Sequence, residues 1–105
     1  MTIPAPRDVD IRALLTSVKR IAVVGFSDDA TRPSHTIARY LAAQGYSVIG
    51  VNPTLASRGT VAGIAVVASI AEAAPVDLVD VFRRPDQVMP IVDDAIAAGV
   101  PAIWF

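Results

Sequence analysis

The strongest constraint on the fold is a strand–loop–helix–strand unit that spans residues 21–53. It begins with the apolar segment IAVVG, continues through a polar loop and an amphipathic stretch, and ends with a second apolar segment, SVIGVNP. A unit of about 30 residues is the size at which two parallel strands become neighbours through a right-handed helical crossover. The segment therefore predicts a parallel sheet with helices packed on it.

The spacing of apolar residues predicts the remaining elements. We expect strands over residues 20–24, 47–51, 63–67, 77–82 and 102–105, and a loop over residues 52–62. We expect helices over residues 8–18, 34–44 and 69–74, and a last helix that begins between Asp86 and Pro90 and ends at Gly99. The inner stripe of the second helix is expected to be Ile37, Ala38, Leu41 and Ala42. Residues 1–7 are expected to form a flexible lead.

Alternation of strands and helices predicts a three-layer α/β sandwich around a parallel five-stranded sheet. Right-handed crossovers and a reversal after the third strand give the order 3-2-1-4-5. The crevice at the reversal then lies between the carboxyl ends of the first and fourth strands. Ligands of such sheets bind at this crevice, so the loops 25–33 and 82–84 are the candidate ligand-binding segments.

Composition narrows the class of protein. The chain has 105 residues, a net charge of −1 and no cysteine. It therefore offers no general positive field for nucleic acid or an anionic membrane, and no disulfide or thiolate chemistry. The first residues, MTIPAPRDVD, do not resemble a signal peptide, and no apolar run approaches the ~18 residues needed to cross a bilayer. We expect one soluble, cytoplasmic domain.

The loop after the first strand has the position of a nucleotide-binding loop, where helix N–H groups and the helix dipole favour a phosphate. It contains GFSDDA, however, and the second strand ends in VNP. Both the G-x-G-x-x-G fingerprint and the acid that binds an NAD ribose are therefore missing. Gly25 either leaves room for a phosphate or simply forms a tight turn. The loop indicates a nucleotide ligand other than NAD.

Three arginines fall on the two loops beside the predicted crevice. Arg32 precedes Pro33 and Ser34 at the start of a helix, where an isolated cation is unfavourable unless an anion is also present. The alternative is a solvated arginine paired with one of the aspartates of the sequence DDA. Arg83 and Arg84 follow the fourth strand, and guanidinium groups suit phosphates. The alternative is that one or both of them point into solvent.

Four other polar or aromatic positions have two interpretations each. Asn52, before Pro53, avoids the repulsion that an acid would exert on a ribose phosphate, but Asn-Pro is also a common turn. Asp80 shares a strand face with apolar residues, so a structural hydrogen bond is favoured over catalysis. His35, the one histidine, either lines the pocket or is exposed. Trp104 is expected in the core or against the last helix.

The chain resembles the small stand-alone coenzyme A-binding proteins, which are similar to the CoA-binding domain of the succinyl-CoA synthetase α subunit. The resemblance covers residues 8–105 and is carried by VVG-x-S, RPS, VNP and VDVFRR, in that order. It implies a Rossmann-like fold with the ligand at the carboxyl edge of the sheet. The binding residues it implies are Gly25, Phe26 and Ser27 in the ligand loop, Arg32, Pro33 and Ser34 at the phosphates, Asn52 and Pro53 at the adenosine, and Phe82, Arg83 and Arg84 on the other wall.

The function that the resemblance implies is non-catalytic binding of coenzyme A or an acyl-CoA, with no catalytic residues and no metal. Two alternatives remain open: an enzyme or regulator that uses NADP or another adenine nucleotide, and a ligand-free interaction module. Members of the family usually continue for some 30 to 40 residues beyond the position of Phe105. The chain is thus expected to be short at its C-terminus, and a homodimer is one way to protect its final strand.

Overall fold

The structure is a computed structural model that describes residues 18–105. The predicted lead over residues 1–7, and all but the last residue of the predicted helix over residues 8–18, lie outside the described residues. The strands are β1 (Arg20–Val24), β2 (Ser47–Val51), β3 (Thr60–Val61), β4 (Ile64–Val67), β5 (Leu78–Val81) and β6 (Ile103–Trp104). The helices are α2 (Pro33–Ala43), α3 (Ile70–Ala73) and α4 (Val88–Ala97), with 3₁₀ turns at Ala56–Arg58 and Pro85–Gln87. None of the helices in this part of the chain is long and apolar enough to cross a membrane.

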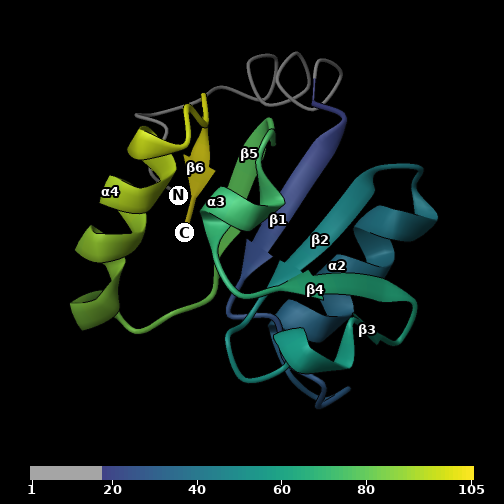
Figure 1. Cartoon of the computed structure of the whole chain (residues 1–105). Helices are drawn as coiled ribbons and strands as arrows, with labels where there is room; N and C mark the ends of the chain where they lie inside the picture. The colour runs from purple at the N-terminus through teal and green to yellow at the C-terminus, as the bar shows by residue number, and fades with distance from the viewer. Residues whose placement is uncertain (1–17) are drawn as a thin grey trace.

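The sheet has six strands in the order β3-β4-β2-β1-β5-β6 (Figure 1). Its five parallel strands follow the predicted order, and β1 lies between β2 and β5 as expected. The prediction of a loop over residues 52–62 was wrong at its end, because β3 pairs antiparallel with β4 there. A strand of two residues has no periodicity to detect. It depends on a tight turn in which Ala62 and Gly63 have φ of 53° and 81°.

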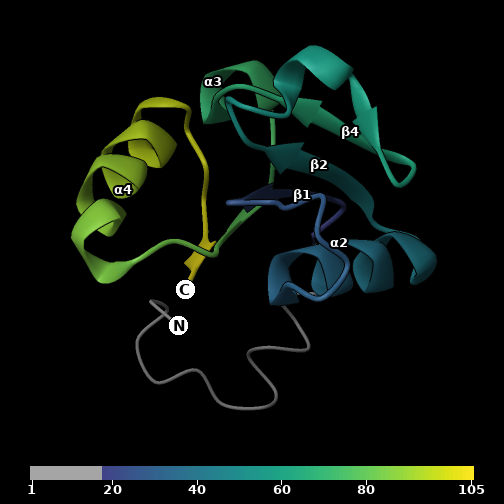
Figure 2. The ribbon, with the colours of Figure 1, turned by 90° about the horizontal axis from the view of Figure 1, so that it is seen from below.

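Both faces of the sheet are covered. Figure 2 shows α2 on one side of the sheet, and α3 and α4 on the other. Along β1, Ile21 and Val23 belong to the core on the α2 side, whereas Ala22 and Val24 belong to the core on the α3–α4 side. Burial on both faces explains why the strands are continuous runs of Val, Ile and Ala. Trp104 is half-buried against the core on the α2 side, so the first of its two expected positions, in the core, is the one observed, and not the one against the last helix.

Helix α2 buries a different stripe from the one its apolar residues predict. Ser34, His35 and Ala38 are its buried residues, Leu41 is half-buried against the core, and Ala42 is exposed. The burial is therefore concentrated in the first turns of the helix, next to the loop that follows β1. The polar side chain of His35 enters the interior there because the loop offers its ring a hydrogen-bond acceptor, which hydrophobic periodicity does not register.

Asp77 joins the beginnings of β1 and β5. Its Oδ2 accepts hydrogen bonds from the backbone N–H of Lys19 (2.9 Å) and of Arg20 (3.0 Å), while its own N–H donates to the carbonyl of Arg20 (2.8 Å). The two hydrogen bonds from these backbone N–H groups lower the pKa of Asp77, because they stabilise the carboxylate form. This contact sets the register of the two strands whose opposite ends form the candidate site.

Asp80 lies on the α2 face of β5, in register with Val23 on β1 and Trp104 on β6. Burial raises the pKa of Asp80 to about 6. The structural hydrogen bond expected for this carboxyl group is not found among residues 18–105. Desolvation without a compensating donor favours the protonated acid, which explains the direction of the shift.

Asp80→Asn is expected to stabilise the protein at neutral pH. As pH rises from 3.8 to about 6, the unfolded chain loses the Asp80 proton before the folded chain does, so folding becomes less favourable over this window. After discounting for partial exposure, the gain at pH 7 should be about 1–2 kcal/mol in the free energy of unfolding. Urea unfolding at pH 7 and pH 4 measures it, and the gain should shrink toward zero at pH 4. The exposed Asp93→Asn is the matched control. A gain of equal size at both pH values contradicts the prediction.

Candidate functional site

The loops that follow β1, β2 and β5 meet around one cleft of about 780 Å³ at the carboxyl edge of the sheet. Its lining residues are Gly25, Phe26, Ser27, Arg32, Pro33, Ser34, Asn52, Val81, Phe82, Arg83, Arg84 and Gln87. The fold thus brings together every predicted binding residue except Pro53, which does not line the cleft. Val81 and Gln87 were not predicted. Gln87 lies four residues after Arg83 in the segment that follows β5. Its place in that segment was the feature of the sequence from which its contribution to the cleft could have been predicted.

Gly25 is the point where the ends of three strands converge. Its N–H donates to the carbonyl of Val51 at the end of β2 (3.0 Å). On the other side of β1, the N–H of Phe82, just after β5, donates to the carbonyl of Val24 (2.8 Å). A Cβ at Gly25 would lie 2.3 Å from the carbonyl oxygen of Phe82, and φ is +86°. Close backbone approach and backbone conformation therefore both require glycine. The sequence suggested two reasons for glycine at position 25, a tight turn or room for a ligand. The structure adds a third, which is the close packing of the end of β1 on the end of β5.

Phe26 contributes backbone to the cleft and side chain to the core. Its ring is fully buried. It stacks on the imidazole of His35, with ring centroids 5.7 Å apart and an interplanar angle of 11°. The same ring lies directly over Gly50, where an added Cβ would be 2.6 Å from Cδ2 of Phe26. Phe26 therefore anchors the ligand loop in the core.

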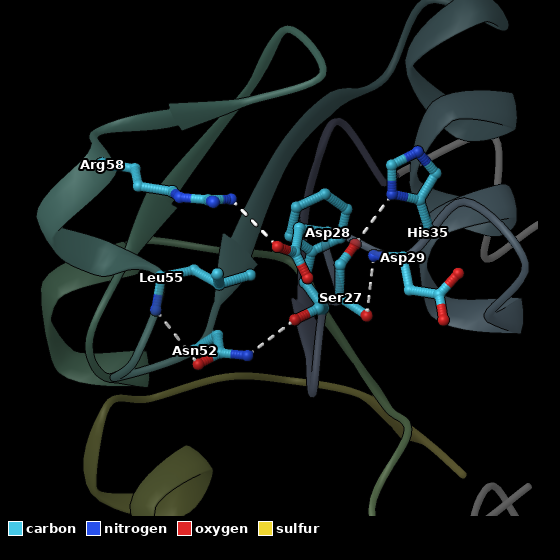
Figure 3. A network of polar contacts seen from close by, with 8 residues as sticks. Ser27, Asp28, Asp29, His35, Asn52, Leu55 and Arg58 are labelled. Carbon is cyan, nitrogen blue, oxygen red and sulfur yellow. Dashed lines mark hydrogen bonds and ion pairs between the residues drawn. The ribbon is translucent and has the colours of Figure 1, made fainter.

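His35 is buried beneath this loop, with 5% of its surface exposed. Its Nδ1 lies 2.8 Å from the carbonyl oxygen of Ser27 (Figure 3). The expectation that His35 lines the pocket or is exposed was wrong. The ring is held inside by the stack on Phe26 and by its hydrogen bond to the loop, and neither contact could be inferred from a lone histidine in a helical pattern.

Asn52 connects the end of β2 to the same loop. Its Nδ2 donates to the carbonyl of Phe26 (2.9 Å). Its Oδ1 accepts from the N–H of Thr54 (2.8 Å) and of Leu55 (3.3 Å), and Figure 3 shows the contact with Leu55. The second pair of contacts is the Asx-type turn that the Asn-Pro sequence indicates. Asn52 thus forms a turn and lines the cleft, with both ends of its amide engaged by the backbone.

Two consecutive peptides of the ligand loop, Phe26–Ser27 and Ser27–Asp28, have their carbonyl groups paired and their N–H groups open. The carbonyl of Phe26 accepts a hydrogen bond from Asn52, and the carbonyl of Ser27 is hydrogen-bonded to His35. In a planar trans peptide the N–H points opposite to the C=O. The N–H groups of Ser27 and Asp28 therefore point away from these two side chains. Within residues 18–105, neither of these groups nor the N–H of Ser34 has a hydrogen-bond acceptor.

The aspartates of the loop have partners other than Arg32. Asp28 forms an exposed ion pair with Arg58 (3.0 Å), so the alternative in which Arg32 pairs with this residue is not seen. Asp29 accepts from the N–H (2.9 Å) and the hydroxyl (2.7 Å) of Thr31. The hydrogen bonds from Thr31 are the main cause of a lowered pKa at Asp29, to which the charge of Arg32 adds. The hydrogen bonds thereby hold Asp29 as a carboxylate, and the side chains of both aspartates are exposed.

The arginines of the cleft differ in their surroundings. Arg32 occupies the position before the first turn of α2, with no side-chain cap on that helix end. Arg83 folds toward the ligand loop, since its Nε would lie 3.3 Å from a Cβ at Gly25. Arg84 has a long, exposed contact with Asp86 (3.6 Å). Among the described residues no carboxylate forms an ion pair with Arg32 or Arg83. The cleft therefore has a local excess of positive charge in a chain that is nearly neutral overall.

Comparison with known proteins identifies the family. Residues 19–105 match the family model described as CoA binding domain. Over 100 residues, the chain is 36% identical to the uncharacterized protein YneT of Bacillus subtilis, covering 94% of this chain and 72% of YneT.

Two solved structures are also similar. A hypothetical protein from Pyrococcus horikoshii OT3 superimposes with a TM-score of 0.88 at 35% identity, over 98% of this chain and 71% of its own. A protein from Thermus thermophilus, cell-free ID.343, has a TM-score of 0.85 at 39% identity, over 94% of this chain and 74% of its own. The fold is Rossmann-like, as the resemblance implied. The chain belongs to the CoA binding domain family.

Proposed function

We propose that this protein binds coenzyme A or an acyl-CoA without catalysing a reaction on it, and holds the phosphorylated ADP portion in the cleft at the ends of β1, β2 and β5. The observation that carries the proposal is the joint presence of three arginines and open backbone N–H groups around that cleft in a chain of the CoA binding domain family. Its volume of about 780 Å³ falls within the range typical of small-molecule sites.

Phosphate is the chemical group that best fits the cleft. In the part of the chain that the structure describes, the N–H groups of Ser27, Asp28 and Ser34 are donors without acceptors, and a phosphate supplies acceptors. Arg32 is a cation at the positive end of a helix, which is unfavourable until an anion binds beside it. The planar guanidinium of Arg83 is suited to bidentate contact with a phosphate.

Binding without catalysis is supported by the side chains that face the cleft. They are arginines, hydroxyls, amides and apolar groups. His35 is buried with its Nδ1 engaged by the loop, and neither His35 nor Asp80, on the α2 face of β5, is among the residues that line the cleft. Neither titratable group is placed to exchange a proton with a molecule in the cleft.

NADP is the competing ligand, since an arginine can also take its ribose phosphate. Native mass spectrometry of the purified protein with coenzyme A, dephospho-CoA and NADP separates the possibilities. Binding of coenzyme A supports the proposal. Binding of NADP alone would support the cleft as the ligand site but contradict coenzyme A as its ligand. Binding of none of the three favours an interaction module.

Coenzyme A is expected to bind at least about tenfold more tightly than dephospho-CoA, because the 3′-phosphate adds charge-assisted hydrogen bonds to arginine. Titration calorimetry measures the ratio. Among Arg32→Gln, Arg83→Gln and Arg84→Gln, the variant that removes the partner of the 3′-phosphate should bring the ratio toward one.

Arg39→Gln is the matched control, because Arg39 is an exposed residue of α2 outside the cleft. It removes the same charge and should leave the ratio unchanged. Equal affinity of the wild-type protein for coenzyme A and dephospho-CoA would show that the arginines do not hold the 3′-phosphate.

A further inference from the structure

We propose that His35 is a positioning residue, which fixes the peptide between Ser27 and Asp28 so that its N–H faces the ligand. The inference rests on the proposed function, since the ligand is taken to be a diphosphate of the coenzyme A type. His35 does not line the cleft, and it contacts the ligand loop from the buried side.

The role of Nδ1 as a donor follows from its partner. A carbonyl oxygen accepts hydrogen bonds and cannot donate them, so Nδ1 of His35 carries the proton in its 2.8 Å contact with Ser27. The ring is 5% exposed and stacked on Phe26, and this geometry leaves it little freedom to rotate. The donor is therefore directed at a single acceptor.

The direction of one carbonyl decides the electrostatic character of the loop. While His35 holds the Ser27 carbonyl, the N–H of Asp28 points the other way. A rotation of this peptide would turn the carbonyl oxygen toward the ligand, where its partial negative charge would repel a phosphate. Asn52 acts in the same manner one peptide earlier, through its 2.9 Å hydrogen bond to the carbonyl of Phe26. Two consecutive peptides of the loop are thus held in the orientation that suits an anion (Figure 3).

Phe26 and Ser27 also hold the ligand loop in place. The Phe26 ring lies between the imidazole and the backbone of Gly50, so the same side chain that stacks on His35 also fixes the loop to β2. Ser27 closes the loop on its other side, where its Oγ accepts from the N–H of Asp29 (3.0 Å). The Asp28 side chain adds an exposed ion pair with Arg58 (3.0 Å), but among the described residues the hydrogen bond from His35 is the contact made to the Ser27–Asp28 peptide group itself.

Two substitutions separate this role from simple packing. His35→Phe keeps an aromatic ring against Phe26 and removes the donor. His35→Asn removes the ring and keeps a donor, because the asparagine amide nitrogen occupies about the place of Nδ1. We expect His35→Phe to weaken binding of coenzyme A by about tenfold, the factor set by one buried hydrogen bond, and His35→Asn to restore most of that loss. Thermal unfolding of each variant, measured alongside, reports any general loss of stability.

The ratio of affinities for coenzyme A and dephospho-CoA separates an effect on the loop from an effect on the arginine that holds the 3′-phosphate, while thermal unfolding reports general damage. His35 acts on the loop and not on the 3′-phosphate, so His35→Phe should weaken both ligands by the same factor. A changed ratio, or wild-type affinity in His35→Phe, overturns the inference and leaves the proposed function in place.

A measurement without ligand keeps the inference testable if coenzyme A does not bind to the wild-type protein, which would overturn the proposed function alone. Backbone ¹⁵N order parameters of Ser27 and Asp28 should be near the rigid value of about 0.85 in the wild type and fall toward about 0.6 in His35→Phe. They should stay high in His35→Asn. Order parameters that are the same in the wild type and in His35→Phe show that the loop does not depend on this hydrogen bond.

Discussion

Gly25→Ala is expected to lower the free energy of unfolding by about 3 kcal/mol or more and to reduce ligand binding severely. The methyl group would lie 2.3 Å from the carbonyl oxygen of Phe82, and the residue has a φ of +86°. The clash is with backbone, which cannot turn aside as a flexible side chain can. Relief would require β1 and β5 to separate where Phe82 donates to Val24 (2.8 Å). The same movement would displace the wall of the cleft that carries Arg83.

Chemical denaturation at pH 7 measures the loss, and Gly45→Ala is the matched control. Gly45 also has a positive φ, +100°, but an added Cβ there meets nothing within 4 Å. Gly45→Ala should therefore show only the cost of the backbone conformation, about 1 kcal/mol. The difference between the two variants isolates the contact with Phe82. Similar losses in both would mean that this contact contributes nothing.

Phe26→Ala is expected to lower the free energy of unfolding by about 3–5 kcal/mol, the usual result of removing a fully buried phenylalanine ring. Gly50→Ala should cost about 1–3 kcal/mol by overpacking, since its methyl group would lie 2.6 Å from Cδ2 of Phe26. In the double variant the ring that causes the overpacking is absent, so the second change should cost much less than it does alone. The two losses should therefore not add.

A double-mutant cycle with four proteins, unfolded in urea at pH 7, tests this coupling. Gly63→Ala is a suitable second site for comparison, because an added Cβ there meets nothing within 4 Å. Its cost should be the same with and without Phe26. If Gly50→Ala costs as much in the Phe26→Ala background as in the wild type, the ring and the glycine do not pack against each other in solution.

The loop after β1 joins the stability of the fold to the shape of the site. The side chain of Phe26 is buried in the core, and its carbonyl accepts a hydrogen bond from Asn52. The carbonyl of Ser27 accepts one from His35. Ligand-binding loops are usually among the less stable parts of a protein. Here the loop is anchored at consecutive residues, so we expect little change in its backbone on binding. The exposed side chains of Arg32, Arg83 and Arg84 remain free to adjust to the phosphates.

The amino-acid sequence alone determined the parallel α/β fold and the position of the cleft. The bounds of β1 and β2 are the predicted ones, because each begins at a polar residue and continues as a short apolar run that becomes buried. The order of the parallel strands follows from right-handed crossovers, a rule that does not depend on individual side chains. The carboxyl ends of β1 and β5 then meet at the reversal, and with them the loops that carry Arg32 and Arg83.

Only the tertiary structure decided how the loop is held and where the polar residues lie. His35 is buried because Phe26, nine residues earlier, stacks on it, and Phe26 fits because residue 50 has no side chain. The partner of Asp28 is Arg58, 30 residues away, and β3 exists only through its pairing with β4. These contacts join residues that are distant or irregularly spaced along the chain. Local periodicity reports which face of an element is buried, but not which side chain from another element will meet it there.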